Sequence, residues 1–296
     1  MKNIFIVGGS GFLGYYLLKI LKKNYNVYAH QNKTLIKEKN INIVKLNLYK
    51  KSLLRIFLNK NNISTVVNLS SVTNVETCEK YKLKAKKIHV NFLDNLVKSC
   101  LKKKIKIVHI STDHIFSGAK NTAYSENDKA FPINYYGKTK YLGEEIVKQY
   151  RNHLILRTNF FGKNLNSKKS FSDKIYYNLK KKIQINIWSD IYFSPLHVRN
   201  VAFIICYLIN KKATGVYHLS SSKVSKYKFS QQIAKILKLE KKLIAANLFD
   251  TKKFVNRPRN MSLSNLKIKK KFPELKNKLS LKNQLNLLKS DYIHAK

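Results

Sequence analysis

Hydrophobic residues follow two alternating patterns along the first half of the chain. Short runs rich in valine, isoleucine and aromatic residues predict buried strands, at residues 3–7, 25–29, 43–47, 65–69, 105–111 and 154–157. Between them, apolar residues at helical spacing predict helices at 15–23, 52–59, 76–101 and 135–149. Strands and helices that alternate in this way predict an α/β fold with a doubly wound parallel sheet. Ligands of such sheets bind beyond the carboxyl ends of the strands.

A glycine-rich turn joins the first predicted strand to the first predicted helix. Its glycines are Gly8, Gly11 and Gly14, in the spacing G-x-x-G-x-x-G. Glycines permit a tight turn and a close approach of the backbone to a ligand. The start of the helix offers free N–H groups and the positive end of its dipole to a phosphate. A strand, a glycine turn and a helix in this order predict a dinucleotide-binding site of the Rossmann type.

The regular alternation loosens after about residue 158. Aromatic and polar loops follow, with helices predicted at 201–209 and 229–237 and a strand at 216–219. We interpret residues 1–158 as the NAD(P)-binding domain and residues 159–296 mainly as a smaller C-terminal α/β lobe that binds the substrate. Some later segments could return to the first domain. The last ten residues are expected to form a frayed tail.

Tyr136 and Lys140 are four residues apart in the predicted helix 135–149, and so share one helix face. A nearby ammonium stabilises phenolate and is expected to lower the tyrosine pKa from about 10 towards neutrality. Such a phenol can donate and accept a proton at cellular pH. Thr112 follows the strand at 105–111, where a hydroxyl can bond a substrate oxygen. The run Ser-Thr-Asp that contains it is also typical of a turn or a helix cap.

Composition limits the class of protein. The 296 residues are 44% hydrophobic, which favours a large core over disorder. No run approaches the roughly 20 apolar residues that cross a bilayer. Three widely spaced cysteines, Cys78, Cys100 and Cys206, predict free thiols in a reducing compartment, the cytoplasm. The net charge of +44 is compatible with a polyanionic partner. However, nearly all the 59 basic residues are lysines spread along the chain, which favours a biased composition over a specific nucleic-acid site.

These features resemble the extended short-chain dehydrogenase/reductase superfamily, and within it the dTDP-4-dehydrorhamnose reductase family of nucleotide-sugar 4-ketoreductases. The likeness covers most of the chain and is strongest over residues 1–160. Besides the glycine turn and the Tyr136/Lys140 pair, it rests on segments 68–71, 90–91, 111–116, 143–144, 156–158 and 257–262. The Ser-Thr-Asp-His-Ile-Phe segment at 111–116 and the Arg-Pro segment at 257–262 are the more specific to the family.

The resemblance implies a role for each matching residue. Tyr136 would donate a proton to the substrate carbonyl, Lys140 would lower the pKa of Tyr136 and hold the nicotinamide ribose, and Thr112 would bond the carbonyl oxygen. The implied cofactor contacts are Gly8, Gly11, Phe12, Leu13, Gly14, Lys33, Asn47, Leu48, Leu69, Ser70, Ser71, Asn91, Tyr136 and Lys140. The implied substrate contacts are Thr112, His114, Arg257 and Arg259. The implied reaction is NADPH-dependent reduction of the 4-keto group of a nucleotide-activated 6-deoxy sugar for surface polysaccharide.

The choice of cofactor depends on the end of the second predicted strand. NAD-selective sites usually place an acidic residue there, on the ribose hydroxyls. This chain has no acid at residues 29–33, and His30 and Lys33 could meet a 2′-phosphate instead. We therefore expect NADPH, with NADH as the alternative. Where many relatives carry Asp after the third strand the chain has Asn47, which weakens one expected adenine contact.

Some family members form a magnesium-linked dimer through a glutamate early in the first helix. Tyr15 and Tyr16 hold the matching positions here and supply no carboxylate. We therefore expect no metal and do not expect that dimer, although another homodimer stays open.

Four other functions stay open. A nucleotide-sugar dehydratase would need two acids after Thr112, but Asp113 is followed by His114. An epimerase would usually carry the acid after the second strand. A non-catalytic NADP-binding regulatory subunit would not need Thr112, Tyr136 and Lys140. A nucleic-acid-binding protein, the most different class, would show salt-sensitive binding of long polyanions.

Overall fold

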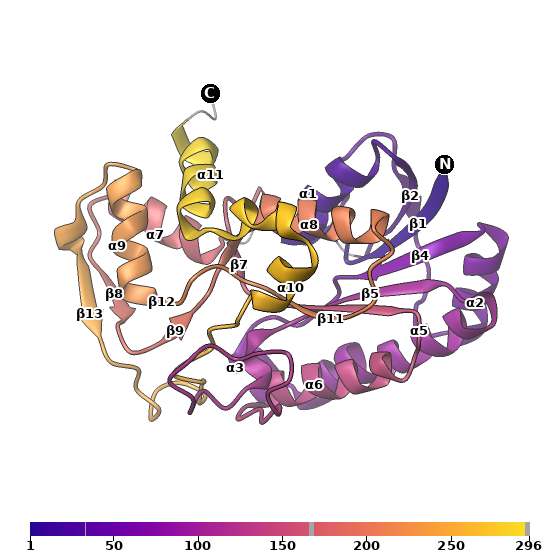
Figure 1. Ribbon diagram of the computed structural model, residues 1–296, viewed down its shortest axis with the longest axis horizontal. Helices are drawn as coiled ribbons and strands as arrows, with labels where there is room; N and C mark the ends of the chain where they lie inside the picture. The colour runs from indigo at the N-terminus through magenta and orange to yellow at the C-terminus, as the bar shows by residue number, and fades with distance from the viewer. Residues whose placement is uncertain (33, 166–168, 294–296) are drawn as a thin grey trace. The chain divides into compact units, whose positions relative to one another are not determined.

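The computed structural model describes residues 1–32, 34–165 and 169–293 (Figure 1). The chain divides into two compact units, each described here by itself. Unit 1 consists of residues 1–115, 132–157 and 202–217, and unit 2 of residues 116–131, 158–201 and 218–296. The predicted division at residue 158 stays a prediction. No helix in the described ranges is long and apolar enough to cross a membrane.

A seven-stranded sheet with the order β11-β6-β5-β4-β1-β2-β3 forms the centre of the first unit. Its strands are β1 (Lys2–Val7), β2 (Tyr25–His30), β3 (Asn42–Val44), β4 (Ile63–Asn68), β5 (Lys106–Ser111), β6 (His153–Thr158) and β11 (Gly215–Leu219). In this sheet order, each neighbouring pair of strands from β6 through β5, β4, β1 and β2 to β3 is parallel. The predicted α/β class with a Rossmann-type parallel sheet is confirmed. The strand order reverses between β1 and β4, which is where such sheets bind their ligands.

Helices and short helical turns connect the strands of unit 1. They are α1 (Phe12–Leu21), α2 (Lys51–Lys60), α3 (Val75–Lys80), α4 (Lys82–Lys86), the π-helical turn η1 (Lys87–Asn91), α5 (Phe92–Cys100), the 3₁₀ turns η2 (Leu101–Lys103) and η3 (Asp113–Ile115), α6 (Tyr135–Lys148) and α8 (Val198–Asn210). All six residues of β5 are buried, as expected of a central parallel strand covered on both faces.

The segment 76–101, predicted to be largely helical, is helical over most of its length. It is interrupted at Tyr81, whose backbone leaves the helical region (φ −117°, ψ 62°), and its residues 87–91 form a π turn within the helical run. Apolar spacing did not reveal the interruption, because the pattern continues through it. The structure corrects one predicted element of this unit. The strand predicted at 43–47 is only Asn42–Val44, since the next residues turn towards α2.

Unit 2 is built from short pieces around an aromatic core. Its elements are β7 (Phe160–Phe161), α7 (Phe171–Lys180), β8 (Ile185–Trp188), β9 (Tyr192–Phe193), β10 (Leu196–His197), β12 (Val224–Ser225), α9 (Lys226–Ile236), η4 (Lys241–Leu243), β13 (Ile244–Asn247), α10 (Leu266–Lys271), η5 (Pro273–Leu275), η6 (Asn277–Leu279) and α11 (Leu281–Ile293). The strands form the two-stranded pairs β10-β7, β12-β9 and β13-β8. The buried ring of Phe229 packs edge-on against the rings of Phe161 and Phe193, with centroid distances of 4.8 Å and 5.3 Å.

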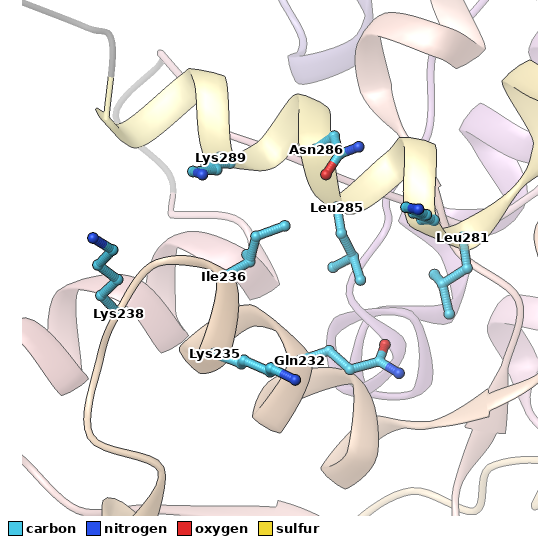
Figure 2. A pocket seen from close by; sticks show the side chains of 9 residues that line it. Gln232, Lys235, Ile236, Lys238, Leu281, Leu285, Asn286 and Lys289 are labelled. Atoms are coloured by element: carbon cyan, nitrogen blue, oxygen red, sulfur yellow. The ribbon is translucent and has the colours of Figure 1, made fainter.

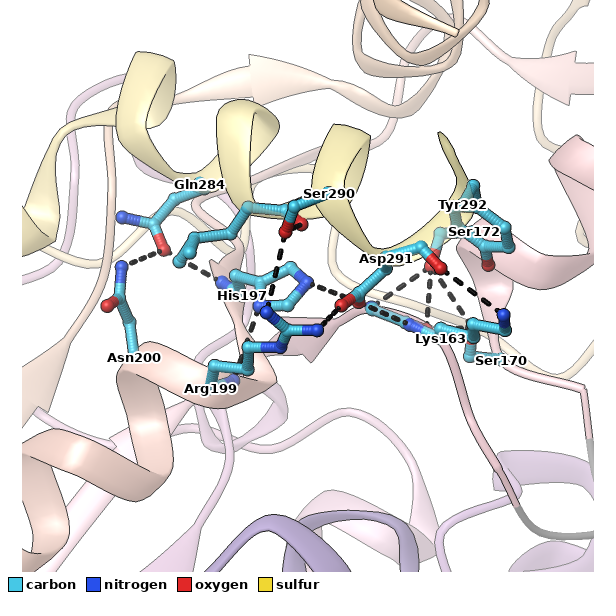
Figure 3. Close-up of polar contacts among 12 residues, drawn as sticks. Lys163, Ser170, Ser172, His197, Arg199, Asn200, Gln284, Ser290, Asp291 and Tyr292 are labelled. Carbon is cyan, nitrogen blue, oxygen red and sulfur yellow. Dashed lines mark hydrogen bonds and ion pairs between the residues drawn. The ribbon is translucent and has the colours of Figure 1, made fainter. Parts of the chain in front are cut away.

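The expectation of a frayed tail is wrong up to residue 293, because α11 is anchored by the buried carboxylate of Asp291 (Figure 3). Its Oδ2 accepts a hydrogen bond from His197 Nε2 at 2.9 Å and one from the Lys163 backbone N–H at 3.2 Å. Arg199 forms an ion pair with the other oxygen. Residues 294–296 lie outside the described ranges.

A buried ion pair ties α6 to the sheet of unit 1. Arg157, on β6, donates to both carboxylate oxygens of Glu144, on α6, at distances of 2.8 to 3.1 Å. Glu144 is 0% exposed and Arg157 3%. A charge removed from water to this degree depends on its partner.

We expect Glu144→Gln to destabilise the protein by about 3–5 kcal/mol, because the guanidinium of Arg157 then stays buried without a carboxylate. Glu145→Gln is the matched control, since this neighbour pairs with Lys148 at the surface and exposed pairs contribute only about 0–1 kcal/mol. Urea unfolding of both variants checks the prediction. Equal losses in the two variants would contradict it.

Candidate active site

Two glycines of the turn between β1 and α1, Gly8 and Gly14, leave no room for a side chain. Gly8 has φ +84°, and a Cβ there would lie 3.0 Å from the backbone of Leu69 and Ser70. A Cβ on Gly14 would lie 2.4 Å from the Gly9 carbonyl oxygen. Gly11 is the N-cap of α1 and supplies no side-chain cap to the first N–H groups of the helix. The turn therefore fits the cradle that a pyrophosphate needs.

Tyr136 and Lys140, both on α6, are buried, and only 9% and 3% of their surfaces are exposed. Tyr136 hydrogen-bonds with the hydroxyls of Thr112, just after β5, and Ser71, three residues after β4. Lys140 Nζ donates to the Ile110 carbonyl oxygen of β5 at 2.7 Å. The fold thus brings these four predicted site residues together at the carboxyl ends of two neighbouring strands.

Burial dominates the electrostatics of this pair. It raises the pKa of Tyr136 well above its ordinary value, with the Asp113 carboxylate adding to the effect and hydrogen bonding to Thr112 opposing it. It also lowers the pKa of Lys140 to about 8, although Glu144 acts in the other direction. The sequence-based expectation that the Tyr136 pKa falls towards neutrality is therefore wrong in direction. At neutral pH the phenol keeps its proton.

Two glycines on α6 allow the helix to approach its neighbours closely. A Cβ on Gly137 would lie 2.3 Å from the His114 carbonyl oxygen in η3, and a Cβ on Gly143 would lie 2.4 Å from the His89 carbonyl oxygen in η1. The start of the helix is capped from two sides. Asn134 Oδ1 accepts the Gly137 N–H at 2.9 Å, and Glu79 Oε2, on α3, accepts the Tyr135 N–H at 3.0 Å.

His89, which the sequence analysis did not single out, lies among these groups. Its Nε2 is 2.9 Å from Ser71 Oγ and 3.0 Å from the Val72 backbone N, and its Nδ1 is 2.8 Å from Thr139 Oγ1. Its ring lies edge-on to Tyr136, with centroids 5.9 Å apart. The available signal was its position two residues before Asn91, because Asn91 was itself an expected cofactor contact.

His114 lies beside the pair but is not a carboxylate. Its ring is edge-on to Tyr136, with a centroid distance of 5.4 Å, and its Nδ1 is 3.5 Å from the amide nitrogen of Asn134. Asp113, the one acid that follows Thr112, is 1% exposed and accepts the Thr112 hydroxyl at 3.1 Å.

The other expected cofactor contacts differ in their surroundings. Ser70 donates its N–H and hydroxyl to Asn68 Oδ1, at 3.1 and 2.6 Å, beside the glycine turn. His30 Nε2 is 3.0 Å from the Leu46 carbonyl oxygen. Asn91 is exposed, and within the described ranges no hydrogen bond joins it to Tyr136 or Lys140. Lys33 lies outside the described residues. The contacts of the remaining expected residues with a cofactor stay predictions: Phe12, Leu13, Asn47, Leu48 and Leu69.

Arg257 and Arg259, the expected substrate contacts of the later segment, belong to unit 2. The Arg257 guanidinium lies 5.1 Å above the Trp188 ring. Arg259 lies 5.0 Å above Phe249 and forms an ion pair with Asp190. Their contact with a substrate stays a prediction.

A cavity of about 490 Å³ in unit 2 contains none of the predicted site residues (Figure 2). It lies between α9 and α11 and is lined by Gln232, Lys235, Ile236, Lys238, Leu281, Lys282, Leu285, Asn286 and Lys289. Its titratable lining residues are all lysines, and none of the residues expected to carry the chemistry lines it.

A Rossmann-type sheet with a glycine turn after β1 and a buried Tyr-x-x-x-Lys pair beside a hydroxyl after β5 defines an extended short-chain dehydrogenase/reductase. The family model described as "RmlD substrate binding domain" matches residues 1–288. The chain belongs to this family, and the predicted resemblance is confirmed.

Known relatives agree with this assignment. The chain is 27% identical to the spore coat polysaccharide biosynthesis protein SpsK of Bacillus subtilis, over 83% of both chains. It is 25% identical to the dTDP-4-dehydrorhamnose reductase of Aggregatibacter actinomycetemcomitans, over 92% of this chain and 94% of that one. Among solved structures, a hypothetical dTDP-4-dehydrorhamnose reductase from Sulfolobus tokodaii aligns with a TM-score of 0.81 and 29% identity, over 91% and 94% of the two chains.

We expect Gly137→Ala to destabilise the protein by about 1–3 kcal/mol, because the new methyl group overlaps the His114 carbonyl oxygen. At an unconstrained helix position the same change stabilises by up to about 1 kcal/mol. Lys138→Ala is the control, since Lys138 is the adjacent, exposed residue. Urea unfolding measures whether the substitution lowers or raises the free energy of unfolding. A stabilised Gly137→Ala variant would show that α6 does not need this close contact.

Proposed function

We propose that the protein is an NADPH-dependent reductase of the 4-keto group of a nucleotide-activated 6-deoxy sugar, acting in surface polysaccharide biosynthesis. The observation that carries the proposal is the buried, protonated phenol of Tyr136 beside Thr112, next to a glycine turn shaped for a dinucleotide. Relatives named dTDP-4-dehydrorhamnose reductase and Spore coat polysaccharide biosynthesis protein support the substrate class. A cytoplasmic location is part of the proposal, and a homodimer stays a prediction.

The residues of the site fit a nicotinamide dinucleotide. Gly8, Gly11 and Gly14 would hold the pyrophosphate, Ser70 would lie beside the cofactor, and Lys140 would bond the nicotinamide ribose. When bound, the cofactor supplies the hydride that reduces the carbonyl carbon. A dTDP-4-dehydrorhamnose reductase of Bacillus anthracis, which shares the fold at a TM-score of 0.83 and 23% identity over the whole of both chains, was solved in complex with NADP.

The protein's own groups manage the proton. Thr112 and Tyr136 would both bond the substrate carbonyl oxygen and so fix its position. As that oxygen gains negative charge, the O–H bond of Tyr136 breaks and the proton passes to the oxygen, which becomes the new hydroxyl. The ammonium of Lys140 stabilises the phenolate that is left until solvent returns a proton. An elimination would need a second acid after Thr112, where His114 stands instead.

We expect Tyr136→Phe to lower kcat by about 10²–10⁴-fold, the usual contribution of a positioned general acid, and to leave NADPH binding intact. Tyr135→Phe is the matched control, as it removes the adjacent phenol on the same helix. The assay follows NADPH oxidation with a panel of nucleotide-activated 4-keto-6-deoxy sugars. Undiminished turnover by the Tyr136 variant would contradict the role of Tyr136 as the proton donor. Binding of NADPH without turnover of any sugar would favour a regulatory subunit.

We also expect kcat/KM to be at least about tenfold higher with NADPH than with NADH. No acid follows β2 to bond the ribose hydroxyls of NADH, and one charge-assisted contact to the 2′-phosphate is worth about 1.5–3 kcal/mol. Kinetics with each cofactor at saturating keto sugar check the ratio. Equal or better turnover with NADH would show that the cofactor preference is misread.

A further inference from the structure

The cavity between α9 and α11 has the size and the inner wall of a small-ligand site. Its volume of about 490 Å³ lies within the range of about 300–1,000 Å³ that is typical of ligand pockets. Leu285 on α11 is buried, and Leu281 on α11 and Ile236 on α9 are half-buried. Figure 2 shows Leu285 pointing from α11 towards α9. All three side chains belong to or pack against the core of unit 2, so the fold fixes this apolar wall.

Exposed lysines surround the apolar wall. Four of the nine lining residues are lysines, a larger share than the 59 basic residues among the 296 of the whole chain. They are Lys235, Lys238, Lys282 and Lys289. The acids nearest to them in sequence have other partners, since Glu240 pairs with Lys242 and Asp291 is held by His197. Within the described ranges no carboxylate pairs with any of the four lysines, so the mouth of the cavity is positively charged.

The direction of the apolar side chains distinguishes this cavity from a membrane-binding face. A helix that lies on a membrane projects large apolar residues outward into the lipid. Here the exposed lining residues are the four lysines, Gln232 and Asn286, whereas the leucines and the isoleucine face inward. A ligand must therefore bring its own apolar part into the protein. A single hydrocarbon chain can do this, and the surface of a bilayer cannot.

We propose that this cavity binds a single-chain amphiphile with an anionic head group, a carboxylate or a phosphate, as a free molecule. The hydrocarbon chain lies against Ile236, Leu281 and Leu285, where its burial drives binding. The head group stays at the mouth, where the lysine ammonium groups attract it. The cavity contains none of the residues of the proposed reductase site. The proposal therefore goes beyond that function and does not depend on it.

A series of chain lengths tests the apolar part of the site. Octanoate, decanoate and dodecanoate are titrated into the full chain by calorimetry, below their micelle concentrations. We expect one saturable site, with an affinity that rises about three- to fourfold for each buried CH₂ until the cavity is full. Dodecyl phosphate, in a parallel titration, shows whether phosphate or carboxylate is preferred. Dodecyltrimethylammonium carries the same chain on a cation, and equal binding of this probe would overturn the proposal.

Substitution of the four lysines tests the charged part, and a matched control is essential in so basic a chain. The test variant combines Lys235→Gln, Lys238→Gln, Lys282→Gln and Lys289→Gln. The control variant makes the same change at four exposed lysines of unit 2 that do not line the cavity: Lys174, Lys252, Lys270 and Lys276. We expect the test variant to bind dodecanoate about fivefold or more weakly, the combined effect of four exposed ion pairs. Equal weakening in both variants would indicate a general attraction of anions and would overturn the proposal.

A third comparison places the binding in the cavity. Asn286 is exposed and lines the cavity, so Asn286→Trp fills it with a ring without disturbing a buried position. Asn277→Trp adds the same ring at an exposed position outside the cavity. With both variants folded by thermal denaturation, only Asn286→Trp should weaken dodecanoate binding, by about tenfold or more, because the indole displaces several CH₂ groups.

Three outcomes would overturn the assignment of the cavity to a free amphiphile. The first is undiminished binding of dodecanoate by Asn286→Trp. The second is binding to phosphatidylglycerol vesicles with no binding of dodecanoate, which would indicate a membrane surface. The third is self-association that Asn286→Trp abolishes, again with no binding of dodecanoate, which would indicate a second copy of this chain as the occupant.

Discussion

The close contact of α6 with the backbones of η1 and η3 is the constraint on which the site depends. Gly137 and Gly143 allow helix and backbone to approach to distances that no side chain would permit. Glycine within a helix costs roughly 0.5–1 kcal/mol relative to alanine, so the chain gives up helix stability for this approach. The buried Glu144–Arg157 pair holds the same helix on the sheet. Tyr136 and Lys140 are thereby placed at the ends of β4 and β5.

Burial gives this arrangement its chemical character. A phenol in contact with water would exchange its proton freely, but Tyr136 is enclosed, and the cost of a buried anion keeps it neutral. The same burial makes the ammonium of Lys140 easier to neutralise. The pair is therefore suited to deliver a proton to an oxygen that becomes negative, which is what the reduction of a ketone requires.

The sequence predicted the sheet, the glycine turn and the Tyr136/Lys140 pair. The spacing of hydrophobic residues and the types of residue directly indicate strands, turns and helix faces. It did not predict the direction of the Tyr136 pKa shift, since spacing reveals the ammonium nearby and not the depth of burial. It also missed His89 and the end of α11. A histidine inside an apolar helix pattern reads as core until its partners Ser71 and Thr139 are known, and the anchoring of Asp291 by His197 joins residues 94 positions apart.

The central claim is that hydride and proton together convert a sugar ketone into an alcohol at this site. It is tested most directly with NADPH that carries deuterium at its transferable position and a nucleotide-activated 4-keto-6-deoxy sugar. The account predicts a sugar product with one deuterium at C4 and stoichiometric oxidation of the cofactor. A keto sugar returned unchanged, or isomerised or dehydrated without the label, would contradict it.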